Sequence, residues 1–308
     1  MQQPAEKLKR ADEVTRQHFG KKISFFHPGF IWIDGNRGKY PAVSITGAHC
    51  QLHCEHCQAK ILQSMISAPN PDLLYEKCLK IAEKGNHGVL ISGGSDHNGA
   101  LPWNQFLPAI GKIKKETDLF VSVHSGIIDE ETALSLKLAG VDQALIDVIG
   151  DDQTLQDIYH ADFGISRIIA SMEALQKAGL PIIPHIVCGL HFGKLRGEKN
   201  ALKIISNFDV AQIVILSIMN LPGTTIKADD LPDAYDIADI IAEARLVMPE
   251  VPISLGCARQ RGNWQLEKLA IDAGVNRMAL PSDEAMEYAL NQGLEVTMQD
   301  TCCSVPCQ

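Results

Sequence analysis

Three of the nine cysteines, Cys50, Cys54 and Cys57, lie within eight residues in a C-x-x-x-C-x-x-C pattern. Three thiolates from one short loop can bind three irons of a cubane cluster and leave the fourth iron open for an added ligand. A structural zinc site or an electron-transfer cluster normally has four protein ligands, so a set of three favours an iron-sulfur cluster with an open position. The alternatives are a zinc site completed by a histidine beside the cysteines, and buried thiols that bind nothing.

Composition limits the class of protein that carries this loop. The chain has 308 residues, 45% of them hydrophobic and 21% charged, which suits one domain close to the size of an α/β barrel. Its formal net charge of -9 shows no electrostatic footprint for nucleic acid. The first residues lack the apolar core of a secretion signal and the longest apolar runs are only strand length, so we expect a soluble, cytoplasmic protein with no membrane segment. Reduced cysteines would then be available as ligands.

Eight short, apolar runs with β-propensity alternate with helical patterns along the chain. The expected strands are residues 42–46, 88–92, 119–123, 143–148, 182–187, 212–218, 252–256 and 277–280. Between them, Pro71 suits a first helical turn and Asp129 can cap the helix that ends at Leu138. Strands joined through helices run parallel, which predicts a (β/α)8 or nearly complete TIM-type barrel, with a doubly wound open sheet as the competitor. We expect an N-terminal extension over 1–40, the barrel over 41–293 and a cysteine-rich tail over 294–308.

The cysteine loop directly follows the first expected strand, where the mouth of such a barrel would carry its chemistry. The segment CQLHCEHC resembles the cluster-binding loop of the radical S-adenosylmethionine (SAM) superfamily. The resemblance implies a 4Fe-4S cluster on Cys50, Cys54 and Cys57, with SAM chelating the open iron through its amino and carboxylate groups. It also implies the (β/α) barrel that the strand pattern predicts.

Six further residues match positions that bind SAM in this superfamily: His56, Gly93, Gly94, Asp147, Val187 and Gly189. The resemblance implies that His56, Val187 and Gly189 contact the adenine. Gly93 and Gly94 would receive the methionine amino group, and Asp147 would hold the ribose. Ser95 stands where the family has glutamate, with Asp96 beside it as a substitute. Taken alone, the two glycines suit a tight strand exit equally well, and Asp147 suits a helix cap.

The chain ends in a second group of thiols, with Cys302, Cys303 and Cys307 in its last seven residues. No helical or strand periodicity surrounds them, and we interpret them as ligands of a second 4Fe-4S cluster. A terminal disulfide or an exposed redox pair is the alternative. If the tail folds over the barrel mouth, a further ligand could come from a residue that follows a strand: Cys188, Cys257 or Arg259. Cys78, in the middle of a helical pattern, is expected to be a core thiol.

Two clusters in one barrel resemble the biotin synthase and lipoyl synthase branch, including the two-protein type of lipoyl synthase. The resemblance implies a 5'-deoxyadenosyl radical that removes hydrogen from an unactivated aliphatic carbon, and an auxiliary cluster consumed as the sulfur source. The function expected is lipoyl synthesis on a protein-bound octanoyl group. The alternatives are a radical SAM mutase or metallocofactor maturase with a structural second cluster, and a noncatalytic iron-sulfur or zinc protein.

The same resemblance implies partners. A reductant such as ferredoxin or flavodoxin would supply the electron, a lipoyl carrier protein would present the substrate, and a second related radical SAM chain would share the sulfur insertions. No nucleic-acid or membrane partner is expected.

Overall fold

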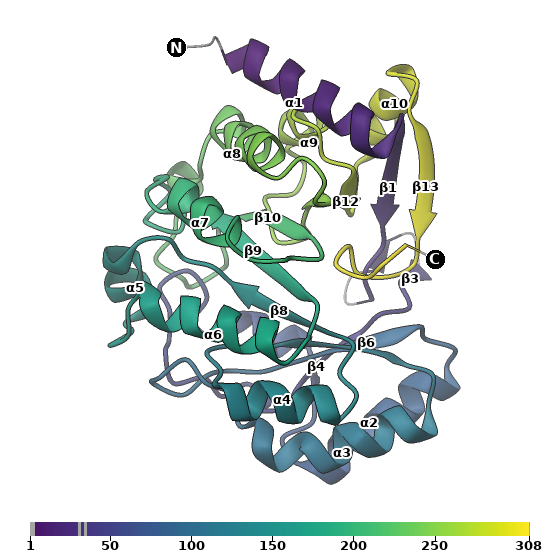
Figure 1. Cartoon of the computed structure of the whole chain (residues 1–308), viewed down its shortest axis with the longest axis vertical. Helices are drawn as coiled ribbons and strands as arrows, with labels where there is room; N and C mark the ends of the chain where they lie inside the picture. Colours follow the sequence, from purple (N-terminus) through teal and green to yellow (C-terminus); the bar gives the residue numbers. More distant parts are fainter. Residues whose placement is uncertain (1–3, 30–31, 34–35, 308) are drawn as a thin grey trace.

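In the described part of the chain, eleven parallel strands form one curled sheet with helices on its outer face (Figure 1). The structure is a computed structural model that describes residues 4–29, 32–33 and 36–307. The strands of the sheet are β1 (Lys22–Phe26), β4 (Ala42–Ser44), β5 (Ile66–Ser67), β6 (Gly88–Ser92), β7 (Phe120–His124), β8 (Gln143–Asp147), β9 (Ile182–Cys188), β10 (Ile213–Ser217), β11 (Ile253–Leu255), β12 (Arg277–Ala279) and β13 (Glu295–Gln299). A separate antiparallel pair consists of β2 (Trp32–Ile33) and β3 (Asn36–Arg37).

The helices follow the strands in alternation. They are α1 (Pro4–Phe19), α2 (Pro71–Glu83), α3 (Trp103–Glu116), α4 (Glu130–Leu138), α5 (Asp152–Tyr159), α6 (Ile165–Lys177), α7 (Glu198–Ile205), α8 (Ala234–Val247), α9 (Trp264–Asp272) and α10 (Asp283–Asn291), with short 3-10 turns at Lys60–Ser64 and Ala228–Asp230. Pro71 opens α2, and the Asp129 side chain accepts a hydrogen bond from the amide of Thr132 at the start of α4, as predicted. Among the described residues, no helix is long and apolar enough to cross a membrane.

The order of the strands confirms a nearly complete barrel. The eight predicted strands lie side by side in chain order as β4-β6-β7-β8-β9-β10-β11-β12. Three more strands extend this set: β5 beside β4, and β1 and β13 beyond β12. Among the described strands, β5 and β13 are the two edges of the sheet. They do not pair with each other, so the sheet curls without closing into a complete barrel.

Two apolar layers hold the sheet in this shape. The larger layer lies between the sheet and the outer helices, and the smaller one lies inside the curl. Along β10, Ile213 and Ile215 belong to the outer layer, whereas Val214 and Leu216 belong to the inner one. This alternation follows from the two-residue period of a strand, because both faces of a barrel strand are buried.

The two ranges expected to flank the barrel each add a strand to its sheet. In the described part of residues 1–40, α1 packs on α8 and β1 pairs with β12 and β13. In residues 294–308, β13 pairs with β1. Figure 1 shows these two strands side by side, although they come from opposite ends of the chain.

The tail does not fold over the barrel mouth, the arrangement for which a further ligand from Cys188, Cys257 or Arg259 is suggested above. The carbonyl oxygen of Cys303 accepts hydrogen bonds from Gln212 (2.8 Å) and Arg277 (3.1 Å), and that of Ser304 accepts one from Gln143 (3.1 Å). Gln143 and Arg277 begin their strands and Gln212 precedes one, so the tail closes the amino-terminal end of the barrel. The physical reason is that these buried donors require acceptors, which the tail backbone provides.

Candidate active site

The cysteine loop starts at the carboxyl end of β4 and is held by backbone hydrogen bonds, both within the loop and to the segment after β6. The amide of Cys57 donates to the carbonyl of Cys54 (3.0 Å), and the amide of Gln51 donates to the carbonyl of Ser95 (2.8 Å), which follows β6. His53, Gln58 and Ala59 adopt positive φ angles of 47°, 50° and 58°. Non-glycine residues in this conformation are costly, so the tertiary contacts of the loop must hold its tight path.

The three thiols of the loop face a cavity of about 270 Å³ inside the barrel mouth. Burial raises the pKa of Cys54, and the neighbouring thiols Cys50 and Cys57 raise it further. Burial also raises the pKa of Cys57. Three thiols that repel one another as thiolates require a positively charged group among them, and an iron-sulfur cluster supplies one.

Gly93 and Gly94 form the floor beneath this loop. A Cβ atom on Gly94 would lie 2.1 Å from the carbonyl oxygen of His49 and 2.5 Å from Cβ of Cys50. At Gly93 the nearest atom would be Oγ1 of Thr46, at 3.1 Å. Both glycines line the cavity, and the amide of Gly94 donates to Oγ1 of Thr46 (2.7 Å). Glycine at 94 is therefore required for the loop to approach the end of β6.

His56 points into the same cavity as the cysteines. Its ring centroid lies 5.1 Å from that of Tyr159, and burial lowers its pKa to about 4. Its Nδ1 atom is buried and has no hydrogen-bond partner among the described residues. A neutral ring with an unpartnered nitrogen suits contact with a bound heteroaromatic group.

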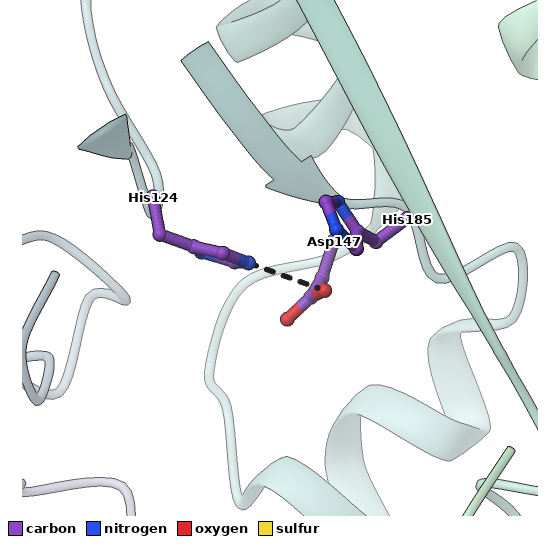
Figure 2. Close-up of side chains that lie close together, drawn as sticks. All are labelled: His124, Asp147 and His185. Atoms are coloured by element: carbon purple, nitrogen blue, oxygen red, sulfur yellow. Dashed lines mark ion pairs between the residues drawn. The ribbon is translucent and has the colours of Figure 1, made fainter. Parts of the chain in front are cut away.

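Asp147, at the end of β8, shares the cavity with His124 from β7, and His185 from β9 lies beside them (Figure 2). Nε2 of His124 and Oδ1 of Asp147 are 3.6 Å apart. Burial raises the pKa of Asp147, but the neighbouring histidines, His124 foremost, outweigh burial and lower the pKa to about 2. Burial also lowers the pKa of His185 to about 4, whereas that of His124 is raised because the Asp147 carboxylate outweighs burial.

The other two predicted SAM contacts, Val187 and Gly189, lie at the carboxyl end of β9. Val187 is on β9 and lines a second, smaller cavity, and the amide of Gly189 donates to Glu198 (2.8 Å). Neither is among the described residues that line the cysteine cavity. The Asp96 carboxylate accepts hydrogen bonds from the amides of Asn98 (2.8 Å) and Ala100 (2.9 Å), so it is engaged in its own turn. Ser95 does line the cavity.

Comparison with known proteins accounts for this arrangement. Residues 44–194 match the family model of the radical SAM superfamily. Curated relatives include a biotin synthase from Citrifermentans bemidjiense, 26% identical over 76% of this chain and 72% of the relative, and one from Aromatoleum aromaticum, 24% identical over 87% and 79%. The chain belongs to the radical SAM superfamily. Within it, the chain falls in the biotin synthase-like branch.

Solved structures support the fold. Methylornithine synthase superposes with a TM-score of 0.63 at 16% identity, covering 91% of this chain and 79% of the other. The FeFe-hydrogenase maturase HydG from Carboxydothermus hydrogenoformans superposes with a TM-score of 0.64 at 13% identity, covering 95% and 72%. Membership of the superfamily, which rests on the family model and the curated relatives, makes the chain a radical SAM enzyme and implies a 4Fe-4S cluster and SAM. Three thiols on one cavity, the glycine floor and the free nitrogen of His56 fit these groups.

The tail cysteines lie in two different places. Cys303 is buried in the inner apolar layer, and Cys302 packs against that layer together with Cys257. A hydrogen bond from the Cys303 thiol lowers the pKa of Cys302 to about 6. Burial and the charge of Cys302 raise the pKa of Cys257 to about 12. Cys307 is exposed at the amino-terminal end of the barrel, where Nη2 of Arg277 lies 3.0 Å from its sulfur.

Two of the suggested additional ligands are excluded by their surroundings. Cys188 is buried in the outer layer, against the helices. Arg259 forms an ion pair with Glu267 (2.6 Å) and donates to three backbone carbonyls, so its role is structural. Cys257, in contrast, lies near the tail, because it packs against the same inner layer as Cys302 and interacts with that thiol. Cys78 is a fully buried thiol in α2, as predicted.

The sequence reasoning missed the polar residues that seat the tail, which are Gln143, Gln212 and Arg277. The sequence feature that could have revealed these residues is a long polar side chain at the start of an otherwise apolar strand. Such a residue in a barrel interior requires a buried partner.

Proposed function

We propose that this radical SAM enzyme inserts sulfur into an unactivated aliphatic chain, with a protein-bound octanoyl group as substrate, as in lipoyl synthesis. The proposal rests on one observation: two separate sets of cysteine thiols lie at opposite ends of the same barrel. Cys50, Cys54 and Cys57 lie at the mouth, and Cys302 and Cys303 enter the interior from the opposite end. The relatives named biotin synthase support the same class of reaction.

In this proposal, the mouth holds the reagents of hydrogen abstraction. The cluster and SAM, when bound, supply the 5'-deoxyadenosyl radical. Cys50, Cys54 and Cys57 hold the cluster, and Gly93 and Gly94 receive the methionine amino group. His56 contacts the adenine together with Val187 and Gly189, which lie at the carboxyl end of β9, and Asp147 holds the ribose.

The walls of the cavity suit an alkyl chain. Its apolar lining includes Leu101, Ile127, Leu155, Phe163 and Ile168. These side chains offer no hydrogen bonds, so they would bind a saturated chain by excluding water from it. The exclusion of water also protects a reactive carbon centre from side reactions.

For the sulfur source, we propose a second 4Fe-4S cluster on Cys302, Cys303 and Cys307. The lowered pKa of Cys302 supports the thiolate form that a metal ligand requires. Cys257, which follows β11 on the mouth side and interacts with Cys302, is the candidate for the fourth ligand. Cys307 would have to turn inward from its contact with Arg277.

We also propose the partners that such a reaction requires. They are a reductant of the ferredoxin or flavodoxin kind, a lipoyl carrier protein that presents the octanoyl-lysine, and a second related radical SAM chain.

The deciding experiment supplies the anaerobically reconstituted protein with SAM, a reductant and an octanoyl-lysine carrier peptide. The product is followed by mass for the gain of sulfur. We expect thiolated peptide in no more than a few turnovers, because the sulfur comes from the enzyme. Replacing Cys302 and Cys303 by alanine should remove about half of the iron and end thiolation, while 5'-deoxyadenosine still forms.

The other outcomes separate the alternatives. If the tail variant loses iron but the unaltered protein thiolates no acyl substrate, the second cluster exists and the lipoyl reading is wrong. A tail variant that keeps all of its iron contradicts the second cluster. Bound zinc without acid-labile sulfide would overturn the whole assignment.

A further inference from the structure

Three ionisable side chains meet inside the barrel mouth, apart from the cysteine loop. One nitrogen of His124, one nitrogen of His185 and one carboxylate oxygen of Asp147 all lie within 4.8 Å of one another. They come from three adjacent strands, β7, β8 and β9, and Asp147 and His185 are partners in the register of the sheet. Figure 2 shows His124 and Asp147 directed toward each other, with His185 beside the carboxylate. Rigid strands therefore hold all three positions.

The distances do not correspond to a direct hydrogen bond. Nε2 of His124 is 3.6 Å from Oδ1 of Asp147, beyond the range of about 2.7–3.2 Å for an N–H···O bond. Two neighbouring ligands of one metal ion, each about 2.1 Å from it, are separated by roughly 3.0 Å in octahedral and roughly 3.4 Å in tetrahedral coordination. The gap between these two atoms is thus the size that a shared ion would span.

The tautomer of His185 also suits a ligand. Its Nδ1 lies 3.1 Å from the carbonyl oxygen of Ile183, so that nitrogen is the donor and Nε2 keeps its lone pair. Metal-binding histidines commonly donate their second nitrogen to a backbone carbonyl in this way, which fixes the orientation of the ring.

The site has access from the cavity. The side chains of His124 and Asp147 are 27% and 35% exposed, and both line the cavity that the cysteine loop faces. His185 is buried behind them. A bound ion would therefore have three protein ligands on one side and open coordination positions toward the cavity.

We propose that His124, Asp147 and His185 bind a divalent transition-metal ion. Two imidazoles and one carboxylate with open positions form a ligand set that suits Mn²⁺, Fe²⁺ or Zn²⁺. The open positions would accept an oxygen or nitrogen atom of a substrate. Oδ1 of Asp147, the oxygen that lies 3.6 Å from Nε2 of His124, would bind the ion, which leaves the second carboxylate oxygen for the ribose contact proposed above.

The test uses Mn²⁺, because this hard ion avoids thiolate ligands and the nine cysteines therefore compete little for it. The protein, with its cluster reconstituted and no SAM present, is titrated with Mn²⁺ and the bound ion is measured by electron paramagnetic resonance. We expect about one bound Mn²⁺ per chain, with electron spin echo modulation from two imidazole nitrogens. His124→Ala, His185→Ala and the isosteric Asp147→Asn should each weaken binding about tenfold or more.

The matched control is His18→Ala, which removes an exposed histidine at the end of α1 and should leave Mn²⁺ binding unchanged. Circular dichroism of each variant separates loss of a ligand from loss of the fold, and Asp147→Asn keeps the shape of the side chain if an alanine variant unfolds. Absence of bound Mn²⁺ in the unaltered protein would overturn the proposal. Bound Mn²⁺ without nitrogen modulation, or with equal affinity in the ligand variants, would also overturn it.

Discussion

Gly94 lies directly against Cys50, with room for no side-chain atom between them: a Cβ atom at 94 would be 2.5 Å from Cβ of Cys50. This contact joins the end of β6 to the cysteine loop that follows β4. The loop can hold its thiols toward the cavity only because its backbone rests on this glycine. The position of the predicted cluster therefore depends on a residue that carries no functional group.

Gly94→Ala should displace the cysteine loop and lower both the iron content and the formation of 5'-deoxyadenosine. The clash is with backbone and with a ligand residue, so the neighbours cannot relax cheaply. Gly93→Ala is the comparison, because its nearest atom would be the side-chain Oγ1 of Thr46 at 3.1 Å. In iron analysis and SAM cleavage assays, Gly94→Ala should bind far less iron and form far less 5'-deoxyadenosine than Gly93→Ala. Equal iron content and equal cleavage in the two variants would refute the role of this contact.

Replacing any one of Cys50, Cys54 and Cys57 by alanine should abolish dithionite-dependent formation of 5'-deoxyadenosine. The fold should survive, because the loop lies at the barrel mouth rather than in its apolar layers. Cys78→Ala serves as the control, since this thiol is buried in α2 and should be dispensable for cleavage. Cleavage retained in all three loop variants would rule out the cluster assignment.

Arg277→Met should release the tail from the barrel. The guanidinium donates to Gln212 and to the carbonyl of Cys303, and its loss leaves buried acceptors short of a partner. We expect a loss of about 2 kcal/mol in the free energy of unfolding. Hydrogen exchange at residues 300–307 should increase, whereas Arg10→Met, at an exposed position in α1, should change neither quantity. An unchanged exchange rate in Arg277→Met would show that other contacts seat the tail.

Lys7 attaches α1 to α8 through ion pairs with Asp239 (2.6 Å) and Glu243 (2.7 Å). Burial opposes both pKa shifts, but the pairing lowers the pKa of Asp239 and raises that of Lys7. A lowered carboxylate pKa contributes stability above its unfolded value of 3.8, which is lost as the pH falls below about 4. A raised lysine pKa contributes stability below 10.5, which is lost as the pH rises through the higher folded value.

Lys7→Met should therefore cost about 0.5–1 kcal/mol at pH 7, because the pairs are partly exposed. This cost should shrink toward pH 2 and above pH 11, where the pairs are lost in the unaltered protein as well. Thermal melts followed by circular dichroism across that range provide the measurement. Lys9→Met, on the exposed side of α1, should show no such profile. A cost that is constant with pH would indicate lost packing instead of lost charge.

The sequence by itself determined the eight central strands and the cysteine loop. Apolar runs of strand length, helix caps such as Asp129 and the spacing of Cys50, Cys54 and Cys57 are local properties, so they can be read without the fold. Only the tertiary structure decided that β1 and β13, from opposite ends of the chain, extend the sheet together. It also decided that the tail closes the amino-terminal end, because this depends on buried donors at the starts of three separate strands, two on the strands and one directly before β10. The grouping of His124, Asp147 and His185 likewise follows from strand register, a long-range property that spacing along the chain does not encode.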